Sequence, residues 1–402
     1  MVSGSDLAVE IGWRIARRSI RLSDGRCGWM GHGTTSTDGW RVSAVTLGPG
    51  LYDGLAGIAL FLATLHRRMG DDVFADLSRG ALKTARDHLS AVPPANRGSF
   101  YLGWTGIAWA TTHVADLIGS DRLRREGEAL MRQALLSPPD GSALDLLQGA
   151  ASALAACMAH LDARPGDAAV SHAASQHAHA LVDAARWDGD MCAWPLGGAG
   201  DGPGLCGLSH GASGIAAALL AYHQATGDAM ALRTAIGALA FEERHFDETE
   251  GSWADRRPGH SGYPALWCHG AGGGALAHRI AAQLLPSELA DLRGRCVVRA
   301  GRASRGLASQ LERGMGNDSL CHGVWGLIAC RRLLGHGDSD VIAKAKERLV
   351  RSGVRSGLPG QGWTPSLMLG DSGVGLAALA LEDDSVAFPP LLPPGLFGVL
   401  KR

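Results

Sequence analysis

The chain has 402 residues, of which 46% are apolar and 19% charged, so it can bury a large core and is not a disordered protein. Its 38 basic and 39 acidic side chains nearly cancel, which excludes the basic footprint of a nucleic-acid-binding protein. Eight cysteines in a chain of this length do not indicate a disulfide scaffold, because such scaffolds belong to small secreted domains.

No segment of the sequence has the pattern of a membrane span or a secretory signal. The longest apolar stretches, such as residues 57–65, are far too short to cross a bilayer. Charged residues interrupt residues 1–20, so this segment lacks the apolar core of a signal peptide. We therefore expect a soluble, cytoplasmic protein with no membrane-spanning segment and no nucleic-acid partner.

A short step that opens with glycine recurs seven times along the chain. The steps span residues 54–57, 103–106, 149–152, 211–214, 270–273, 323–326 and 370–373. The intervals between successive opening glycines are 49, 46, 62, 59, 53 and 47 residues. A period of this length indicates a repeated supersecondary unit. Because the repeat spans nearly the whole chain, it predicts one closed array in place of two or three domains.

Two kinds of helix alternate along the repeats. Each step is followed by apolar residues at helical spacing, as in 57–69 and 214–222, and these residues cover most of the helix, which indicates burial on nearly all sides. Helices with a clear polar face lie between them, for example at 76–88, 120–136 and 340–352. The alternation predicts an inner and an outer helix in each repeat. We find no run of alternating strands with hairpin turns, so the predicted fold class is all-α.

Three long loops, at 187–205, 246–266 and 358–367, each precede an inner helix. We therefore expect all three to border the same mouth, where loops usually carry specificity. The second of these loops contains Arg256 and Arg257.

Two of the glycine steps follow a Cys-His pair, Cys268-His269 before the fifth step and Cys321-His322 before the sixth. The helix N-terminus at such a junction favours a thiolate. Because the pairs occupy equivalent places in neighbouring repeats, we expect both cysteines and one histidine to bind one metal ion. Two cysteines and a histidine with an open fourth position are a catalytic zinc pattern. The spacing leaves His269 and His322 as alternatives for the histidine.

Four segments carry a resemblance to a known family: GLYDGLAG (50–57), GLSHGASG (207–214), WCHG (267–270) and LCHG (320–323). In combination they resemble the lanthionine synthetase C-like (LanC-like) family over about residues 6–381. Residues 51–65 and 367–381 are most similar to the cyclase domain of class II lanthipeptide synthetases. The resemblance implies a single domain over residues 1–402. It also implies an α/α toroid (barrel) of seven inner and seven outer helices, with one zinc ion at one end of the central cavity.

The family's functional residues can be carried over position by position. Its zinc ligands fall on Cys268, Cys321 and His322, its proposed acid/base histidine on His210, and its assisting aspartate on Asp145. Repeats 3 to 6 would then supply the chemistry, while repeats 1, 2 and 7 close the ring.

Two positions depart from the nisin-type cyclases of this family. Those cyclases have tyrosine after the first zinc cysteine, where this chain has His269, as many class II members do. They also have an active-site arginine shortly before that cysteine, and this chain has Pro264 near that position. Arg256 or Arg257 would have to take the place of this arginine.

The resemblance implies a zinc-dependent cyclase of lanthipeptide biosynthesis. Such an enzyme forms lanthionine and methyllanthionine thioether rings by Michael-type addition of peptide cysteine thiols to dehydroalanine or dehydrobutyrine. The partner would be a dehydrated precursor peptide of the ribosomally made, modified class (RiPP), together with a separate dehydratase or dehydratase domain. Two alternatives remain, namely glutathione addition to dehydroamino-acid residues in proteins and a non-catalytic toroid that binds a peptide or a partner. At the first repeat, Tyr52 and Asp53 are interpreted as structural.

Overall fold

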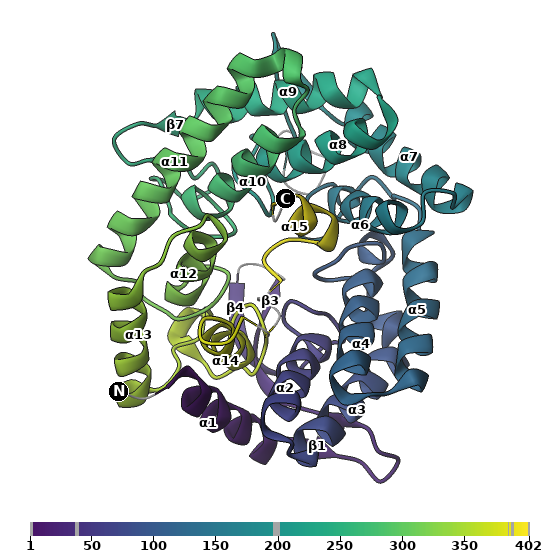
Figure 1. Cartoon of the computed structure of the whole chain (residues 1–402), viewed down its shortest axis with the longest axis vertical. Helices are drawn as coiled ribbons and strands as arrows, with labels where there is room; N and C mark the ends of the chain where they lie inside the picture. The colour runs from purple at the N-terminus through teal and green to yellow at the C-terminus, as the bar shows by residue number, and fades with distance from the viewer. Residues whose placement is uncertain (1–2, 37–39, 196–201, 385, 387–389, 401–402) are drawn as a thin grey trace.

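The computed structural model describes residues 3–36, 40–195, 202–384, 386 and 390–400, and its helices form an inner and an outer ring (Figure 1). Each of the inner helices begins at the residue after one of the opening glycines. They are α2 (Leu55–Met69), α4 (Trp104–Ile118), α6 (Ala150–Ala163), α8 (Ala212–Thr226), α10 (Ala271–Leu284), α12 (Val324–Leu333) and α14 (Asp371–Ala380). The predicted start of the inner helix is confirmed at every repeat.

An outer helix packs against each inner helix. The outer helices of the first six repeats are α3 (Asp72–Asp87), α5 (Asp121–Leu135), α7 (Ala168–Asp183), α9 (Ala229–Arg244), α11 (Ala290–Arg313) and α13 (Ser339–Ser352). The seventh comes from the other end of the chain, because α1 (Gly4–Arg17) packs on α14 and closes the ring (Figure 1). The predicted toroid of seven inner and seven outer helices is therefore confirmed. None of the helices in the described ranges is both long enough and apolar enough to cross a membrane.

Close backbone packing explains why glycine opens each step. A Cβ atom at any of the seven opening glycines would overlap the loop that leads into the helix, as at Gly54, where it would meet the Gly48 carbonyl. Gly270 also has a φ of 81°, which residues with a side chain rarely adopt. Five of the outer helices, namely α1, α3, α5, α7 and α9, begin instead after a residue whose side chain caps the helix. Asp71 is an example, with its Oδ1 accepting a hydrogen bond from the Val73 N–H at 2.9 Å.

In the described parts of the chain, four short antiparallel hairpins, which the sequence pattern did not predict, lie between outer and inner helices. They pair β1 (Ile20–Arg21) with β2 (Cys27–Gly28), β3 (Met30–Ser36) with β4 (Trp40–Thr46), β5 (Arg186–Asp188) with β6 (Met191–Ala193), and β7 (Phe246–Asp247) with β8 (Ser252–Trp253). Most of these strands are too short to show a pattern, and β3 contains two glycines, which weaken a strand signal. The last two hairpins lie largely within the predicted loops 187–205 and 246–266; residues 196–201 of the first loop lie outside the described residues.

The third predicted loop, 358–367, contains a short 3₁₀ helix. The 3₁₀ helices of the described chain are η1 (Leu89–Ala91), η2 (Pro94–Asn96), η3 (Ser287–Leu289) and η4 (Pro359–Gln361). Each of them lies in a connection between two successive α-helices, so none of them interrupts a helix of either ring.

A belt of hydrogen bonds joins the seven junctions, through the residue two positions before each opening glycine. Backbone bonds run from Leu147 N to Ser209 O (3.0 Å), Ser209 N to Cys268 O (3.3 Å), Cys268 N to Cys321 O (3.4 Å), Cys321 N to Met368 O (3.0 Å), Met368 N to Tyr52 O (2.8 Å) and Tyr52 N to Tyr101 O (3.0 Å). The Phe100 N–H completes the circle by donating to Ser152 Oγ at 2.8 Å. Because the main chain makes nearly all of these bonds, the side chains on the belt are free to differ.

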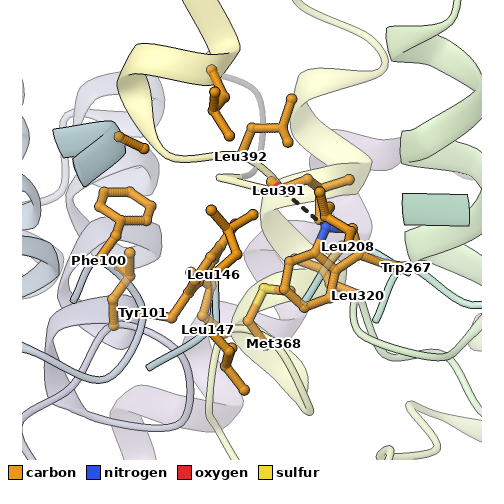
Figure 2. Close-up of a cluster of buried hydrophobic side chains, with 14 of the residues drawn as sticks. Phe100, Tyr101, Leu146, Leu147, Leu208, Trp267, Leu320, Met368, Leu391 and Leu392 are labelled. Carbon is orange, nitrogen blue, oxygen red and sulfur yellow. Dashed lines mark hydrogen bonds between the residues drawn. The ribbon is translucent and has the colours of Figure 1, made fainter. Parts of the chain in front are cut away.

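Apolar side chains fill the hole of the ring (Figure 2). The residue three positions before the opening glycine is fully buried in every repeat. In chain order it is Leu51, Phe100, Leu146, Leu208, Trp267, Leu320 and Leu367. Leu391 and Leu392 pack on this group, and the Trp267 Nε1–H donates to the Leu391 carbonyl at 2.8 Å. The following helix, α15 (Pro394–Leu400), lies inside the ring against α6, α8 and α10. It borders a hollow of about 630 Å³ at the C-terminal ends of α6 and α8. Among the described residues, apolar side chains therefore pack the centre of the ring.

Candidate active site

The residue immediately before each opening glycine stands at the junction end of the ring, next to the belt. In chain order these residues are Asp53, Leu102, Gln148, His210, His269, His322 and Leu369. All of them except His269 keep contact with solvent, whereas the belt residues beside them are buried in every repeat but the first. The histidines of repeats 4 to 6 therefore lie side by side on one face of the belt.

Two cysteines and a histidine from repeats 5 and 6 converge at this face. The thiols of Cys268 and Cys321 and one ring nitrogen of His322 all lie within 4.8 Å of one another. The belt bond between the two cysteines brings their side chains together, although they come from different repeats. Among the described residues, no other group of three Cys, His, Asp or Glu side chains is arranged to hold a metal ion.

The structure separates the two histidines that the sequence pattern left as alternatives. The His322 Nε2–H donates to the Gly357 carbonyl at 2.7 Å, which leaves Nδ1 on the side of the thiols. A histidine that binds a metal usually donates its other ring N–H to a carbonyl in this way. His269 is not part of the group of three; its ring is 4% exposed and stacks on the His210 ring at 5.7 Å.

The thiols of the cluster differ electrostatically from the other cysteines. Burial raises the pKa to about 12 at four cysteines elsewhere in the chain, namely Cys27, Cys157, Cys192 and Cys296. At Cys268, hydrogen bonds from Cys321 and His322 outweigh burial and lower the pKa well below its ordinary value. Burial and the nearby Cys268 raise the pKa of Cys321. The pair therefore releases its first proton readily and its second with difficulty, until a cation compensates the charge.

The donor set fits a zinc ion. Zinc prefers sulfur and imidazole nitrogen donors, and three protein ligands leave a fourth position for another ligand. The three side chains are already oriented by the belt and by the Gly357 carbonyl, so binding would need little rearrangement.

His210 and Asp145 form a hydrogen-bonded pair beside the cluster. Asp145 is 6% exposed, and its Oδ1 accepts the Leu147 and Gln148 N–H groups at 3.0 and 2.8 Å. Its Oδ2 lies 2.7 Å from His210 Nδ1. Burial alone would lower the pKa of His210, but the charge and hydrogen bond of Asp145 overcome that effect and raise it. The pair thus leaves Nε2 of a charged or readily charged imidazole for a substrate.

Glu242, which sequence analysis missed, supports the His210 segment from the outer helix α9. It is fully buried, and its Oε1 accepts the Gly207 and Ser213 N–H groups at 2.9 and 2.8 Å. These groups flank His210 on both sides. Burial, only partly offset by these hydrogen bonds, raises the pKa of Glu242 to about 7. No local sequence signal marks this residue, because it lies on a different helix from the segment that it holds.

The two arginines of the loop before repeat 5 point to different places. Arg257 forms a bidentate ion pair with the buried Asp255, with Nε–Oδ1 and Nη2–Oδ2 distances of 3.0 and 2.6 Å. Its charge acts on both Cys268 and Cys321. Arg256 instead donates from Nε to the Gly204 carbonyl at 2.9 Å, in a pocket away from the cluster. Of the two candidates, the structure brings only Arg257 to the site.

A ring of paired helices with a Cys-Cys-His cluster at its junctions defines the class of protein, an α/α toroid with a candidate metal centre. The model of the lanthionine synthetase C-like protein family matches residues 46–392, and the chain belongs to this family. A solved structure described as nisin cyclase is similar to this chain with a TM-score of 0.62 and 18% identity, over 87% of this chain and 92% of that one. This likeness confirms the toroid fold.

A second structural match is an unsaturated glucuronyl hydrolase from Bacillus sp. GL1, with a TM-score of 0.49 and 14% identity over 96% of this chain and 98% of that one. No curated protein matches the sequence.

Proposed function

We propose that the protein is a zinc-dependent lanthionine synthetase that adds cysteine thiols of a peptide to dehydroalanine or dehydrobutyrine in the same peptide. The observation that carries this proposal is the convergence of Cys268, Cys321 and His322 next to the His210–Asp145 pair. The family to which the chain belongs supports it. In this reaction the thiol sulfur bonds to the β-carbon and the carbon–carbon double bond becomes a single bond. The sulfur loses its proton and the α-carbon gains one, so the addition needs no redox partner.

Cys268, Cys321 and His322 are the residues that would hold one zinc ion per chain. Zinc bound there would lower the pKa of a substrate thiol and so supply a thiolate at neutral pH. The low pKa of Cys268 and the Gly357 bond to His322 prepare the site for the ion.

His210 is proposed to move the proton. Its charged Nε2 gives a proton to the α-carbon after the sulfur has attacked, and the proton that the substrate thiol has lost restores the charged form. Asp145 keeps the imidazole oriented through Nδ1 and favours its charged form. Arg257, held by Asp255, supplies positive charge that stabilises the negative charge developing on the substrate carbonyl oxygen. His269, buried beside His210, limits the space at this side of the site.

A dehydrated precursor peptide is the proposed substrate, and a dehydratase, separate or as a domain, is the proposed source of it. The dehydratase would remove water from serine or threonine of the precursor and so supply the dehydroalanine or dehydrobutyrine that the thiol attacks. We propose that residues 1–402 act in this reaction as one cyclase domain in the cytoplasm.

The test is to incubate the chain with a dehydrated, cysteine-containing peptide and to count free thiols by alkylation and mass spectrometry. We expect about one zinc per chain, loss of peptide thiols without a change of mass, and no reaction after chelation until zinc is restored. Activity in fully metal-free protein would overturn the proposal. A parallel reaction with glutathione separates the alternatives, since a mass increase by glutathione would indicate intermolecular addition. Binding of peptide and zinc without any thioether would indicate a non-catalytic toroid.

A further inference from the structure

The loop before repeat 6 is bonded at two points to a short segment, residues 355–357, that follows α13. The Asp318 N–H donates to the Arg355 carbonyl at 2.9 Å. Two residues further along this segment, the Gly357 carbonyl accepts the His322 Nε2–H at 2.7 Å. Asp318 therefore contacts one end of the segment, and the histidine of the metal cluster contacts the other end.

The side chain of Asp318 also binds this segment. It is fully buried, and its Oδ2 accepts the Arg355 N–H at 2.7 Å. The same oxygen lies 2.5 Å from Arg348 Nη2, and Oδ1 lies 3.3 Å from Arg355 Nη2. Separating a buried carboxylate from such partners is costly, because the charge would be left uncompensated. These contacts therefore fix residue 355 against the loop before repeat 6.

The position of Gly357 is equally restricted. Its N–H donates to the Leu369 carbonyl at 2.8 Å. A Cβ atom on Gly357 would lie only 2.7 Å from His322 Nε2 and 2.8 Å from Ser319 Oγ. The His322 ring thus packs directly on the main chain of residue 357. Any shift of this segment would move the acceptor that holds the ring.

We propose that Asp318 is a positioning residue for the candidate metal centre, which fixes residues 355–357 so that the Gly357 carbonyl holds His322 with Nδ1 towards the thiols. The inference rests on the proposed zinc site. An acceptor bonded to the far nitrogen of a metal-binding histidine fixes its tautomer and direction, and its loss typically lowers metal affinity about 10- to 100-fold. Asp318 would act through this acceptor and not by touching the metal.

Asp338 provides a matched control in the same repeat. Its carboxylate forms a bidentate ion pair with Arg331, with N–O distances of 2.7 and 2.8 Å, and its side chain is only 11% exposed. Asp338 follows the C-terminal end of α12, whereas His322 precedes the N-terminal end of that helix. Asp338→Asn therefore removes the charge that pairs with a largely buried arginine, without altering the segment that holds His322.

The experiment compares the full chain with its Asp318→Asn and Asp338→Asn variants. Zinc affinity is measured by competition with a coloured chelator, and the absorption spectrum is recorded after loading with Co²⁺, whose ligand-field bands report the coordination geometry. We expect Asp318→Asn to bind zinc about 10-fold more weakly and to change these bands, because His322 loses its fixed direction. Asp338→Asn should match the original chain in both measurements, although urea unfolding should show both variants to be less stable.

A third variant, His322→Ala, tests the route by which Asp318 acts. In this background the two cysteines are the remaining ligands, so addition of Asp318→Asn should weaken zinc binding no further. Such non-additivity is expected when two residues act through one contact. An equal loss in both backgrounds would show that Asp318 supports the fold and not the ligand, and would overturn the inference.

The remaining outcomes also decide the inference. Equal zinc affinity and unchanged cobalt bands in Asp318→Asn would overturn it and leave the metal centre intact, and so would an equal change in Asp338→Asn. If the original chain binds neither ion, the proposed function itself fails.

Circular dichroism checks that the variants remain folded. If Asp318→Asn does not fold, Asp318→Glu takes its place, because it keeps the charge beside both arginines and moves the carboxylate away from the Arg355 N–H. It should weaken zinc binding in the same direction, and an affinity equal to that of the original chain would contradict the role of Asp318.

Discussion

Repeats 6 and 7 are neighbours on the belt, yet their belt side chains have different environments. The Cys321 and Met368 main chains make equivalent bonds, each donating to the next repeat and accepting from the previous one. The Cys321 thiol belongs to the metal cluster, whereas the Met368 side chain is fully buried with the apolar group that fills the ring (Figure 2). Main-chain hydrogen bonds therefore hold the belt together, so the side chain at one belt position can differ from its neighbours without breaking the ring.

The largest contrast is expected between substitutions of these two residues. Cys321→Ala should lose zinc and ring formation together, because it removes a ligand, while the helical circular dichroism signal is retained. Met368→Leu conserves volume and should cost less than about 1.5 kcal/mol of stability, with zinc content and activity unchanged. Metal analysis and thiol counting check both variants. A Cys321→Ala protein that still holds stoichiometric zinc would contradict the assigned ligand set.

Substitutions at equivalent positions of repeats 3 and 4 test the proton-transfer role of His210. His210 and Gln148 both precede an opening glycine and both are half-buried. His210→Asn should keep zinc and slow cyclisation by about 10²–10⁴-fold, the usual contribution of a general acid or base. Gln148→Ala should have little effect, since only its main-chain N–H contacts Asp145. Unchanged kinetics in His210→Asn would remove its proposed role.

Glu242 and Glu243 are adjacent on α9 but should respond to pH in opposite directions. The pKa of Glu242 in the folded chain, about 7, is above its usual 4.5, so the folded state holds a proton there that the unfolded state has lost. Stability is full below pH 4.5 and falls as pH rises towards 7, by about 3 kcal/mol. Glu242→Gln keeps an acceptor for Gly207 and Ser213 and should remove most of this loss.

The neighbouring carboxylate provides the control for this measurement. A hydrogen bond and ion pair with Arg299 lower the pKa of Glu243, so its contribution to stability is present above its usual pKa and is lost as pH falls. Glu243→Gln should therefore weaken the fold slightly at neutral pH. Urea unfolding at pH 5 and pH 8 measures both variants. An equal pH dependence in Glu242→Gln and the original chain would show that Glu242 is not the titrating group.

The smallest expected effect concerns the pH profile of the reaction. Asp145 holds the pKa of His210 up against the lowering effect of burial. Activity that needs protonated His210 persists to higher pH when this pKa is raised and is lost as pH rises through it. Asp145→Asn should therefore move the alkaline limb of the pH–rate profile of thiol loss to lower pH, with zinc content unchanged. An unmoved limb would mean that Asp145 only orients the ring.

The starts of the inner helices and the candidate metal ligands could be predicted, because their sequence patterns are local or recur in each repeat. Each opening glycine is required by backbone only a few residues away, and the equivalence of Cys268 and Cys321 follows from the repeat. Glu242 was not predicted in its present role. Its partners, Gly207 and Ser213, lie around the start of α8, and no spacing rule connects them with Glu242 on α9.

The sequence by itself determined the seven-fold repeat, the all-α class and the residue types available for the site. Tertiary structure decided which of them meet. His322 and not His269 faces the thiols, and Arg257 and not Arg256 faces the cluster. His269 and His322 hold equivalent positions in their repeats, and Arg256 and Arg257 are adjacent in one loop, so sequence position could not separate the members of either pair. Only closure of the ring sets which direction leads to the metal site.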